Sequence, residues 1–322
     1  MDRHRSRGRR ARPVRRTSLL YTAVASAVLV GVTGAGTVYV QAHAHEGKGL
    51  VSSASSASAL PSLSPSVGEE ASVEPVAEPS VDRDALLSKA MKSVKAADGA
   101  KASVAVLDVD SGESAGYGDG TFDTASIVKV DILAALLLRA QDADRHLTAQ
   151  EKAYATTMIE NSDNASASAL WAAIGRADGL DAANKRFGLT GTKGGDGELW
   201  GLTQTTAVDQ LTLLQQVFGD DSELGSGSRS YLQGLMGKIA TGQRWGVSAA
   251  ADGTRWALKN GWLPRTATGL WDINSIGRVT VDGHDYLVAV LSDGNSTQAE
   301  GISLVEAASK AAIAAFQDSG EK

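Results

Sequence analysis

The chain contains no cysteine among its 322 residues. This absence excludes disulfide bonds, thiolate metal sites, a cysteine nucleophile and a lipidated cysteine. Histidine is almost as scarce, with five residues in all: His4, His43, His45, His146 and His284. Only the last two lie in the part of the chain expected to fold, and they are far apart in the sequence. The composition therefore argues against a Ser-His-Asp triad and a histidine metal cluster, and it implies no cofactor or metal.

Positive charge is concentrated at one end of the chain. The net charge is −6, yet residues 1–16, "MDRHRSRGRRARPVRR", contain eight arginines. A basic block of this kind can bind nucleic acid. Here it is followed directly by the uncharged apolar run "TSLLYTAVASAVLVGVTGAGTVYV", which is long enough to span a membrane. Because basic residues before such a run remain in the cytoplasm, we predict a membrane segment with the rest of the chain exported, and no nucleic-acid partner.

The composition divides the chain into four parts. Residues 1–16 are interpreted as a basic cytoplasmic segment, and residues 17–42 as a signal-anchor or a signal peptide. An "AHA" ending at Ala44 resembles a signal-peptidase site, so the protein is either anchored in the cell membrane with an extracellular domain or secreted after cleavage. Residues 43–81, rich in serine, alanine and proline, are predicted to form a disordered linker. The folded domain is expected over residues 82–318.

Helical and strand patterns follow one another within that domain. Apolar residues at helical spacing and apolar runs predict helices over 82–97, 121–140, 149–161, 164–175, 179–188, 205–219 and 299–317. Alternating patterns bounded by turns predict a hairpin over 102–120 and strands over 255–262, 270–283 and 284–294. We therefore predict the α+β class, with an antiparallel sheet flanked by helices and packed against an all-helical region.

Ser126 and Lys129 stand at the start of an almost wholly apolar stretch that continues as "VDILAALLLRA". A lysine in such surroundings costs free energy unless it is paired or used. Positions i and i+3 share one face of a helix, so the lysine amine can approach the serine hydroxyl. Burial lowers the pKa of a lysine, which makes it a general base for a serine nucleophile. On spacing alone, an N-capping serine with a snorkelling lysine is the commoner explanation.

Two further polar motifs follow in the chain. "SDN" at Ser162–Asn164 offers a hydroxyl and an amide that can donate and accept, although by itself it would be a helix N-cap. "KNG" at Lys259–Gly261 ends an apolar strand just before Trp262, where a glycine lets a carboxylate-bearing ligand approach the backbone. By itself this motif would be a solvated turn. "KGG" at 193–195 is a rival without a strand before it.

Ser-x-x-Lys at a helix start, Ser-Asp-Asn in a helical region and Lys-x-Gly on a late strand, in this order, resemble the penicillin-recognising serine hydrolases. The likeness is closest to class A β-lactamases and covers roughly residues 82–317, including "TQTTAVDQLTLL" and "ATGQRWGVSAAADGTRWALKNGW". The resemblance implies a β-lactamase/transpeptidase-like fold. It also implies an exported active-site-serine hydrolase that is acylated by a β-lactam or a peptidoglycan-derived peptide.

The resemblance implies a catalytic role for three of the motif residues. Ser126 would be the acylated nucleophile, and Lys129 would be its base or proton relay. Ser162 would pass a proton to the leaving nitrogen of the substrate.

The remaining motif residues are implied to bind the substrate. Asn164 would bind the substrate amide, and Lys259, with Gly261 beside it, would hold the substrate carboxylate. The oxyanion hole would consist of the backbone N–H groups of Ser126 and Trp262.

Several positions depart from the family pattern. Class A enzymes carry a glutamate, in a loop before the third motif, that activates the deacylating water. In the corresponding interval, residues 188–206, Glu198 is the only glutamate and stands too close to "TQTT". The asparagine that normally follows and the Arg–Asp pair that pins the loop are missing. Asn260 replaces the usual Thr or Ser, and the bulky Trp262 replaces a small residue.

These departures predict weak deacylation, with Glu198 as a weak candidate for the deacylating base. They also leave open an alternative, in which the chain is a catalytically weak or inactive penicillin- or peptidoglycan-binding domain at the cell wall.

Overall fold

The computed structural model describes residues 81–317. The predicted basic segment (1–16), the predicted membrane segment (17–42) and, apart from residue 81, the predicted linker (43–81) lie outside the described residues. Within residues 81–317, no helix combines the length and the apolar character needed to cross a membrane.

Eight α-helices and seven strands, with four short 3₁₀ helices (η), make up the described chain. In chain order they are α1 (Arg83–Met91), β1 (Lys101–Asp108), β2 (Ser114–Tyr117), β3 (Phe122–Asp123), η1 (Ala125–Ile127), α2 (Val128–Asp142), α3 (Ala149–Glu160), α4 (Asn164–Ile174), α5 (Arg176–Phe187), η2 (Trp200–Leu202), β4 (Gln204–Thr205), α6 (Ala207–Phe218), α7 (Ser226–Met236), η3 (Thr241–Gln243), η4 (Gly246–Ala250), β5 (Trp256–Pro264), β6 (Trp271–Val281), β7 (His284–Asn295) and α8 (Gln298–Gln317).

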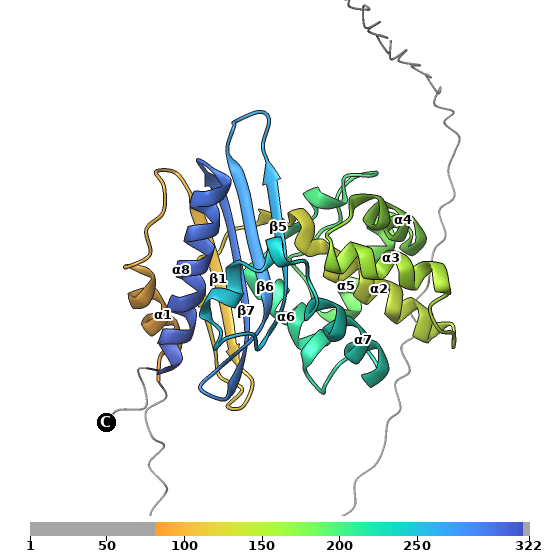
Figure 1. Ribbon diagram of the computed structural model, residues 1–322, viewed down its shortest axis with the longest axis horizontal. Helices are drawn as coiled ribbons and strands as arrows, with labels where there is room; N and C mark the ends of the chain where they lie inside the picture. Colours follow the sequence, from red (N-terminus) through yellow and green to blue (C-terminus); the bar gives the residue numbers. More distant parts are fainter. Residues whose placement is uncertain (1–80, 318–322) are drawn as a thin grey trace, which may run out of the picture. The chain divides into compact units, whose positions relative to one another are not determined.

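Five of the strands form one antiparallel sheet in the order β2-β1-β7-β6-β5, and β3 pairs with β4 separately. Helices α1 and α8 cover one face of this sheet, and α6 packs on the other face, with the remaining helices beyond it (Figure 1). The predicted α+β class and the antiparallel sheet flanked by helices are therefore confirmed.

The central strand β7 shows how the sequence specifies two cores. Successive side chains of a strand point to opposite faces. Leu287, Ala289 and Leu291 accordingly join the core between the sheet and the helical region, whereas Val288 and Val290 join the core beneath α1 and α8. Because both faces of β7 are covered, its sequence is a continuous apolar run rather than an alternation of apolar and polar residues.

Helix α2 is buried along almost its whole length, from Val128 to Leu138, because it runs through the middle of the helical region. This explains why its sequence lacks a polar side. The helix begins at Val128, and Ser126 lies just before it in η1. The N-terminal helix α1 is shorter than predicted, since it ends at Met91 instead of continuing to residue 97.

Helix α7 was not predicted from the sequence. Its first turns are rich in glycine and serine, "SGSRSYLQGLM", and both residue types have low helix propensity. The helix is stabilised by tertiary packing instead, because Leu232, Leu235 and Met236 are buried in the core of the helical region. Packing of an apolar face here outweighs local propensity.

We expect Trp171 on α4 to be a major stabilising residue of the helical region. Its side chain is fully buried, and its indole N–H donates to the carbonyl oxygen of Gly197 at 2.8 Å. Trp171→Ala should lower the free energy of unfolding by about 3–5 kcal/mol because it leaves a cavity. Trp171→Phe should lower the free energy of unfolding by less, although it removes the hydrogen bond to the Gly197 carbonyl. Denaturant unfolding of the three proteins measures both, and an alanine variant as stable as wild type would contradict the assignment.

Candidate active site

Ser126 is held in a strained turn at the edge of the helical region. The preceding residue, Ala125, has φ +48°, a left-handed conformation that is uncommon outside glycine. The backbone before it is fixed from two sides. Asn274 on β6 donates from Nδ2 to the Thr124 carbonyl at 3.0 Å, and the Thr124 N–H donates to the Thr203 carbonyl at 2.9 Å. The turn therefore presents the Ser126 hydroxyl at a position defined by the sheet and the following loop.

Lys129, one turn further along, is fully buried and surrounded by oxygen atoms. Its Nζ lies 3.0 Å from Ser126 Oγ, 3.0 Å from Ser162 Oγ, 2.7 Å from the Ser162 carbonyl and 2.8 Å from Asn164 Oδ1. A charged amine has three hydrogens and no lone pair, so it cannot satisfy four acceptors. A neutral amine has a lone pair, which can accept the proton of the Ser126 hydroxyl.

Burial lowers the pKa of Lys129 from 10.5 to about 7, and the nearby Asp163 carboxylate opposes this shift by raising it. Near neutral pH a large share of the lysine is therefore unprotonated, as a general base requires. Asp163 itself is occupied as the N-cap of α4, since it accepts from the Ser166 N–H at 2.7 Å.

Ser162 joins the two buried lysines. Its Oγ lies 3.0 Å from Lys129 Nζ and 3.1 Å from Lys259 Nζ. Within "SDN", Asp163 rather than Ser162 caps the following helix, and Ser162 adopts φ +57°. The serine hydroxyl is thereby directed toward the lysines instead of toward the helix end. Asn164 is exposed, apart from the contact of its Oδ1 with Lys129.

Lys259 lies on β5, the edge strand beside the helical region, and is fully buried. Its Nζ donates to the Asn260 carbonyl at 2.9 Å in addition to its contact with Ser162. Burial, with the nearby charge of Lys129, lowers the pKa of Lys259 well below its ordinary value.

Gly261 allows β5 to pass directly against the backbone of Ser126. A Cβ at this position would lie 2.7 Å from the Thr124 carbonyl oxygen and 2.9 Å from the Ser126 nitrogen. Any other residue would force the strand and the η1 turn apart. The glycine of the third motif is thus required by the close approach of two backbones.

The side chains of Asn260 and Trp262 point to the opposite side of β5 from Lys259, as strand alternation requires. Asn260 donates from Nδ2 to the Gln243 and Trp245 carbonyls, at 2.7 and 2.9 Å. The Trp262 ring packs against that of Trp245, with centroids 6.1 Å apart. Neither side chain reaches Ser126, so the bulk of Trp262 does not fill the site, and only its backbone remains as a candidate donor.

Glu198 does not join the cluster. Its carboxylate forms an ion pair with Arg176, 2.6 Å from Nε, and its side chain is 59% exposed. The loop residue that faces the lysine is Trp200, whose ring centroid lies 4.9 Å from Lys129 Nζ. Sequence reasoning did not identify Trp200 or Asn274, because neither belongs to a recognised motif and their contacts are long-range.

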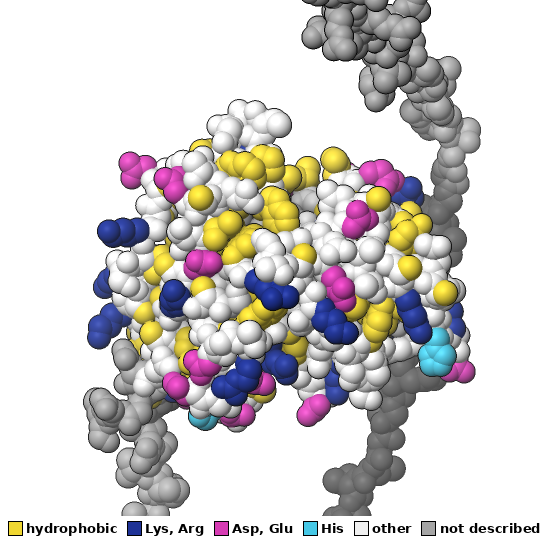
Figure 2. Space-filling model, viewed as in Figure 1, with side chains coloured by type: hydrophobic (Ala, Val, Ile, Leu, Met, Phe, Trp, Pro, Cys, Tyr) yellow, Lys and Arg dark blue, Asp and Glu magenta, His cyan; other side chains and the backbone are white. Residues whose placement is uncertain are grey.

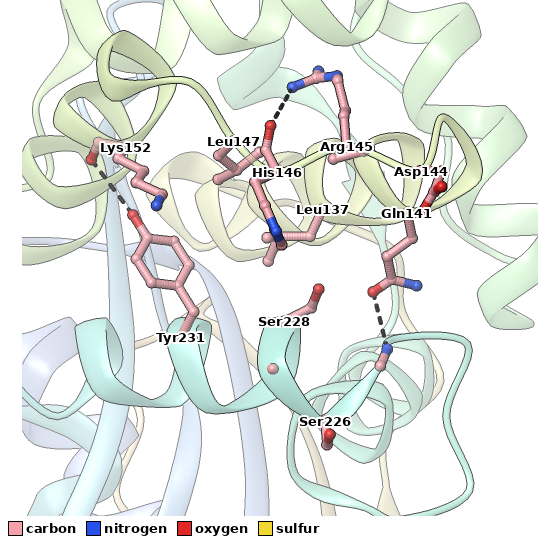
Figure 3. Close-up of a pocket in the computed structure, with 13 residues that line it drawn as sticks. Leu137, Gln141, Asp144, Arg145, His146, Leu147, Lys152, Ser226, Ser228 and Tyr231 are labelled. Atoms are coloured by element: carbon pink, nitrogen blue, oxygen red, sulfur yellow. Dashed lines mark hydrogen bonds between the residues drawn. The ribbon is translucent and has the colours of Figure 1, made fainter.

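Other features of the described chain lie away from this cluster. Asp108, Asp110 and His284 offer ligand atoms within 4.8 Å of one another, but His284 Nδ1 already pairs with Asp110 at 2.9 Å. A cavity of about 610 Å³ lies between the end of α2 and α7, lined in part by His146 and Tyr231 (Figure 3). On the face in Figure 2, basic and acidic side chains are interspersed.

Comparison with known proteins agrees with this geometry. A family model described as "Beta-lactamase enzyme family" matches residues 86–152 and 138–316. No curated protein sequence matches the chain.

Three solved structures illustrate the likeness in fold. The extended-spectrum β-lactamase TLA-1 superposes with a TM-score of 0.63 at 18% identity, covering 73% of this chain and 98% of that chain. PBP-A gives 0.62 at 22% identity, covering 73% and 96%. A class A β-lactamase representative from Bacteroides cellulosilyticus DSM 14838 gives 0.62 at 18% identity, covering 73% and 99%. At these identities the likeness is one of fold.

The lowered pKa of Lys129 predicts a pH dependence. Labelling of Ser126 by a fluorescent penicillin should speed up as pH rises through about 7, because the amine is a base only when neutral. A lysine with its ordinary pKa of 10.5 would place the rise several pH units higher.

Variants test the same assignment. Lys129→Ala should slow labelling by about 10²–10⁴-fold, the usual contribution of a general base. The exposed Lys95 supplies a matched control, and Lys95→Ala should label like wild type. Labelling that is independent of pH, or that survives Lys129→Ala, would contradict the role of Lys129.

Proposed function

The chain belongs to the beta-lactamase enzyme family, and on that basis we propose that it is an active-site-serine hydrolase, acylated on Ser126 by β-lactams or cell-wall peptides. The observation that carries the proposal is the 3.0 Å contact between Ser126 Oγ and the buried amine of Lys129, whose pKa is about 7. A serine hydroxyl beside an amine that is partly neutral near pH 7 can act as a nucleophile with its base.

The proposed acylation uses the hydrogen bonds in sequence. Ser126 Oγ attacks the carbonyl carbon of the substrate amide, and its proton passes to Lys129 Nζ. When the carbon–nitrogen bond breaks, the leaving nitrogen takes a proton through Ser162 Oγ, which is 3.0 Å from Lys129 Nζ. The backbone N–H groups of Ser126 and Trp262 are the proposed donors to the developing oxyanion.

Lys259 is the proposed partner of the substrate carboxylate. In the free protein burial and the neighbouring Lys129 disfavour its charged form. A carboxylate arriving near its amine would favour the charged form, since opposite charges within a few ångströms stabilise each other. Substrate binding would thus charge Lys259, and Asn164, whose amide is exposed, would bind the substrate amide.

Slow deacylation is part of the proposal. None of the four oxygen neighbours of Lys129 Nζ belongs to a carboxylate, and the Glu198 carboxylate is paired with Arg176. The same observations favour the second candidate function, a binding domain that recognises penicillin or peptidoglycan without catalysis. A fluorescent penicillin separates the two, because a non-catalytic binder is not labelled covalently, whereas a slow hydrolase is labelled and stays labelled.

We further propose that the domain works outside the cytoplasm. The arginine-rich residues 1–16, the apolar residues 17–42 and the low-complexity residues 43–81 support a membrane-anchored extracellular domain, or a secreted one if the chain is cleaved near Ala44. A peptidoglycan-derived or β-lactam substrate is found on that side of the membrane. Fractionation of cells, followed by sequencing of the mature N-terminus, distinguishes the anchored from the cleaved form.

Intact-protein mass spectrometry tests the proposal directly. A penicillin should leave a long-lived adduct on the wild-type protein and none on Ser126→Ala. Glu198→Gln should not change the lifetime of the adduct, because this carboxylate faces solvent and Arg176. Glu300→Gln, at another exposed glutamate, is the matched control.

Rapid turnover by the wild type, with an adduct trapped in Glu198→Gln, would make Glu198 the deacylating base. The assignment of slow deacylation would then be wrong, and the protein would be a hydrolytic β-lactamase.

A further inference from the structure

We propose that Trp200 is a positioning residue that shields the Lys129 amine and the acylated Ser126 from water. The inference rests on the proposed function and adds to it a specific cause of slow deacylation. In the mechanism above, Trp200 neither attacks the substrate nor transfers a proton, and its ring contacts the Lys129 amine. Its effect is exerted through Lys129.

The indole ring is a further neighbour of the amine. Lys129 Nζ already has oxygen neighbours from Ser126, Ser162 and Asn164, and the Trp200 ring centroid lies 4.9 Å from it. With these groups around it, the amine is fully buried. A water molecule needs a base beside it to attack an ester on Ser126. The indole lies against the Lys129 amine, and we infer that it covers part of the path by which water would reach that amine.

Local contacts hold the indole in place. Its Nε1 donates to Ser168 Oγ on α4 at 3.1 Å, and the Trp200 carbonyl accepts from the Thr203 N–H at 3.1 Å. The Thr203 carbonyl in turn accepts from the Thr124 N–H, two residues before the nucleophile. A Cβ on Gly201 would lie 4.0 Å from Ala125 Cα, so η2 lies against η1. The ring is therefore fixed to the same backbone that fixes Ser126.

The connecting loop, residues 188–206 between α5 and α6, thus presents an indole to the lysine, while its only glutamate, Glu198, pairs with Arg176. Only Leu199 lies between Glu198 and Trp200 in the sequence. An aromatic ring beside the lysine provides an apolar cover and no proton acceptor.

Two charged groups lie near Lys129: Asp163, which raises the pKa of Lys129, and Lys259, whose own pKa is lowered by burial and by the charge of Lys129. The face of an indole also favours a cation. Since the pKa of Lys129 is nevertheless lowered to about 7, and desolvation is the largest cause, burial is the dominant effect. Removing the ring should rehydrate the amine and move its pKa back toward 10.5.

Opening this space would also give water a base. A water oxygen could then attack the ester carbonyl carbon while its proton passes to Lys129 Nζ. The bond from that carbon to Ser126 Oγ would break, and Oγ would recover the proton from the lysine. The products are a free carboxylic acid and the regenerated serine, so no further reactant is required.

The experiment compares full-length wild type with Trp200→Ala, Trp200→Phe and the control Trp256→Ala, a change at a half-buried tryptophan on β5. Each protein is mixed with a penicillin and followed by intact mass. The pH dependence of adduct formation and the lifetime of the adduct after removal of free penicillin are both recorded. Trp200→Ala should raise the pH midpoint of acylation. At a pH above that midpoint, where the amine is neutral, it should shorten the adduct lifetime by about tenfold or more, a modest fraction of what a general base contributes.

Trp200→Phe should restore both values toward wild type, because it keeps an aromatic cover, and Trp256→Ala should change neither. Ser168→Ala removes only the hydrogen-bond acceptor of the indole N–H. It should shift the pH midpoint and the adduct lifetime in the same direction as Trp200→Ala, but by less. This variant provides the test if Trp200→Ala does not fold. If Trp200→Ala has the pH midpoint and adduct lifetime of the wild type, the inference is overturned while the proposed function stands. The same result in Ser168→Ala has this meaning if Trp200→Ala does not fold. A wild type that forms no adduct would instead remove the proposed function itself.

Discussion

The burial of one amine, that of Lys129, is the constraint on which the rest of the site depends. A lysine in the middle of an apolar helix is costly to charge and must find polar partners. Here those partners come from η1, from the turn before α4 and from α4 itself, through Ser126, Ser162 and Asn164. Because the buried amine contacts all three residues, the apolar packing that buries α2 also fixes the positions of Ser126 and Ser162 relative to each other. Stability of the core and reactivity of the site are thus consequences of the same packing.

The edge strand β5 completes this arrangement from the side of the sheet. Its pleat directs Lys259 toward Ser162 and directs Asn260 and Trp262 away. Gly261 removes the one Cβ that would separate the strand from the nucleophile backbone. The departures of this chain from the family pattern in the third motif therefore fall on side chains that face away from Ser162. The lysine and the glycine of the motif are on the face toward Ser126 and Ser162.

The sequence predicted the structure well where a local periodicity of apolar residues or a short motif determines it. Strand alternation and apolar helical runs predicted an antiparallel sheet and the buried helix α2. The order of three motifs predicted that Ser126, Ser162 and Lys259 would lie together. The sequence failed where tertiary packing decides. Helix α7 forms from a glycine- and serine-rich segment because its apolar residues are buried. Trp200 reaches Lys129 through a loop whose path depends on long-range hydrogen bonds, which no local pattern encodes.

The residue that the connecting loop places beside Lys129 determines whether a proton acceptor for water lies next to the amine. A carboxylate at the lysine would hold a water molecule and take its proton, so each acylation would be followed by hydrolysis. An aromatic ring in contact with the same amine lowers its hydration and provides no proton acceptor. In the proposed mechanism the amine would remain a base for Ser126, because that serine is already within hydrogen-bond distance, whereas an attacking water molecule would have no equivalent partner. Under the proposed function, a site of this kind would favour formation of the acyl-enzyme over its hydrolysis, and the loop residue beside the lysine would contribute to that balance.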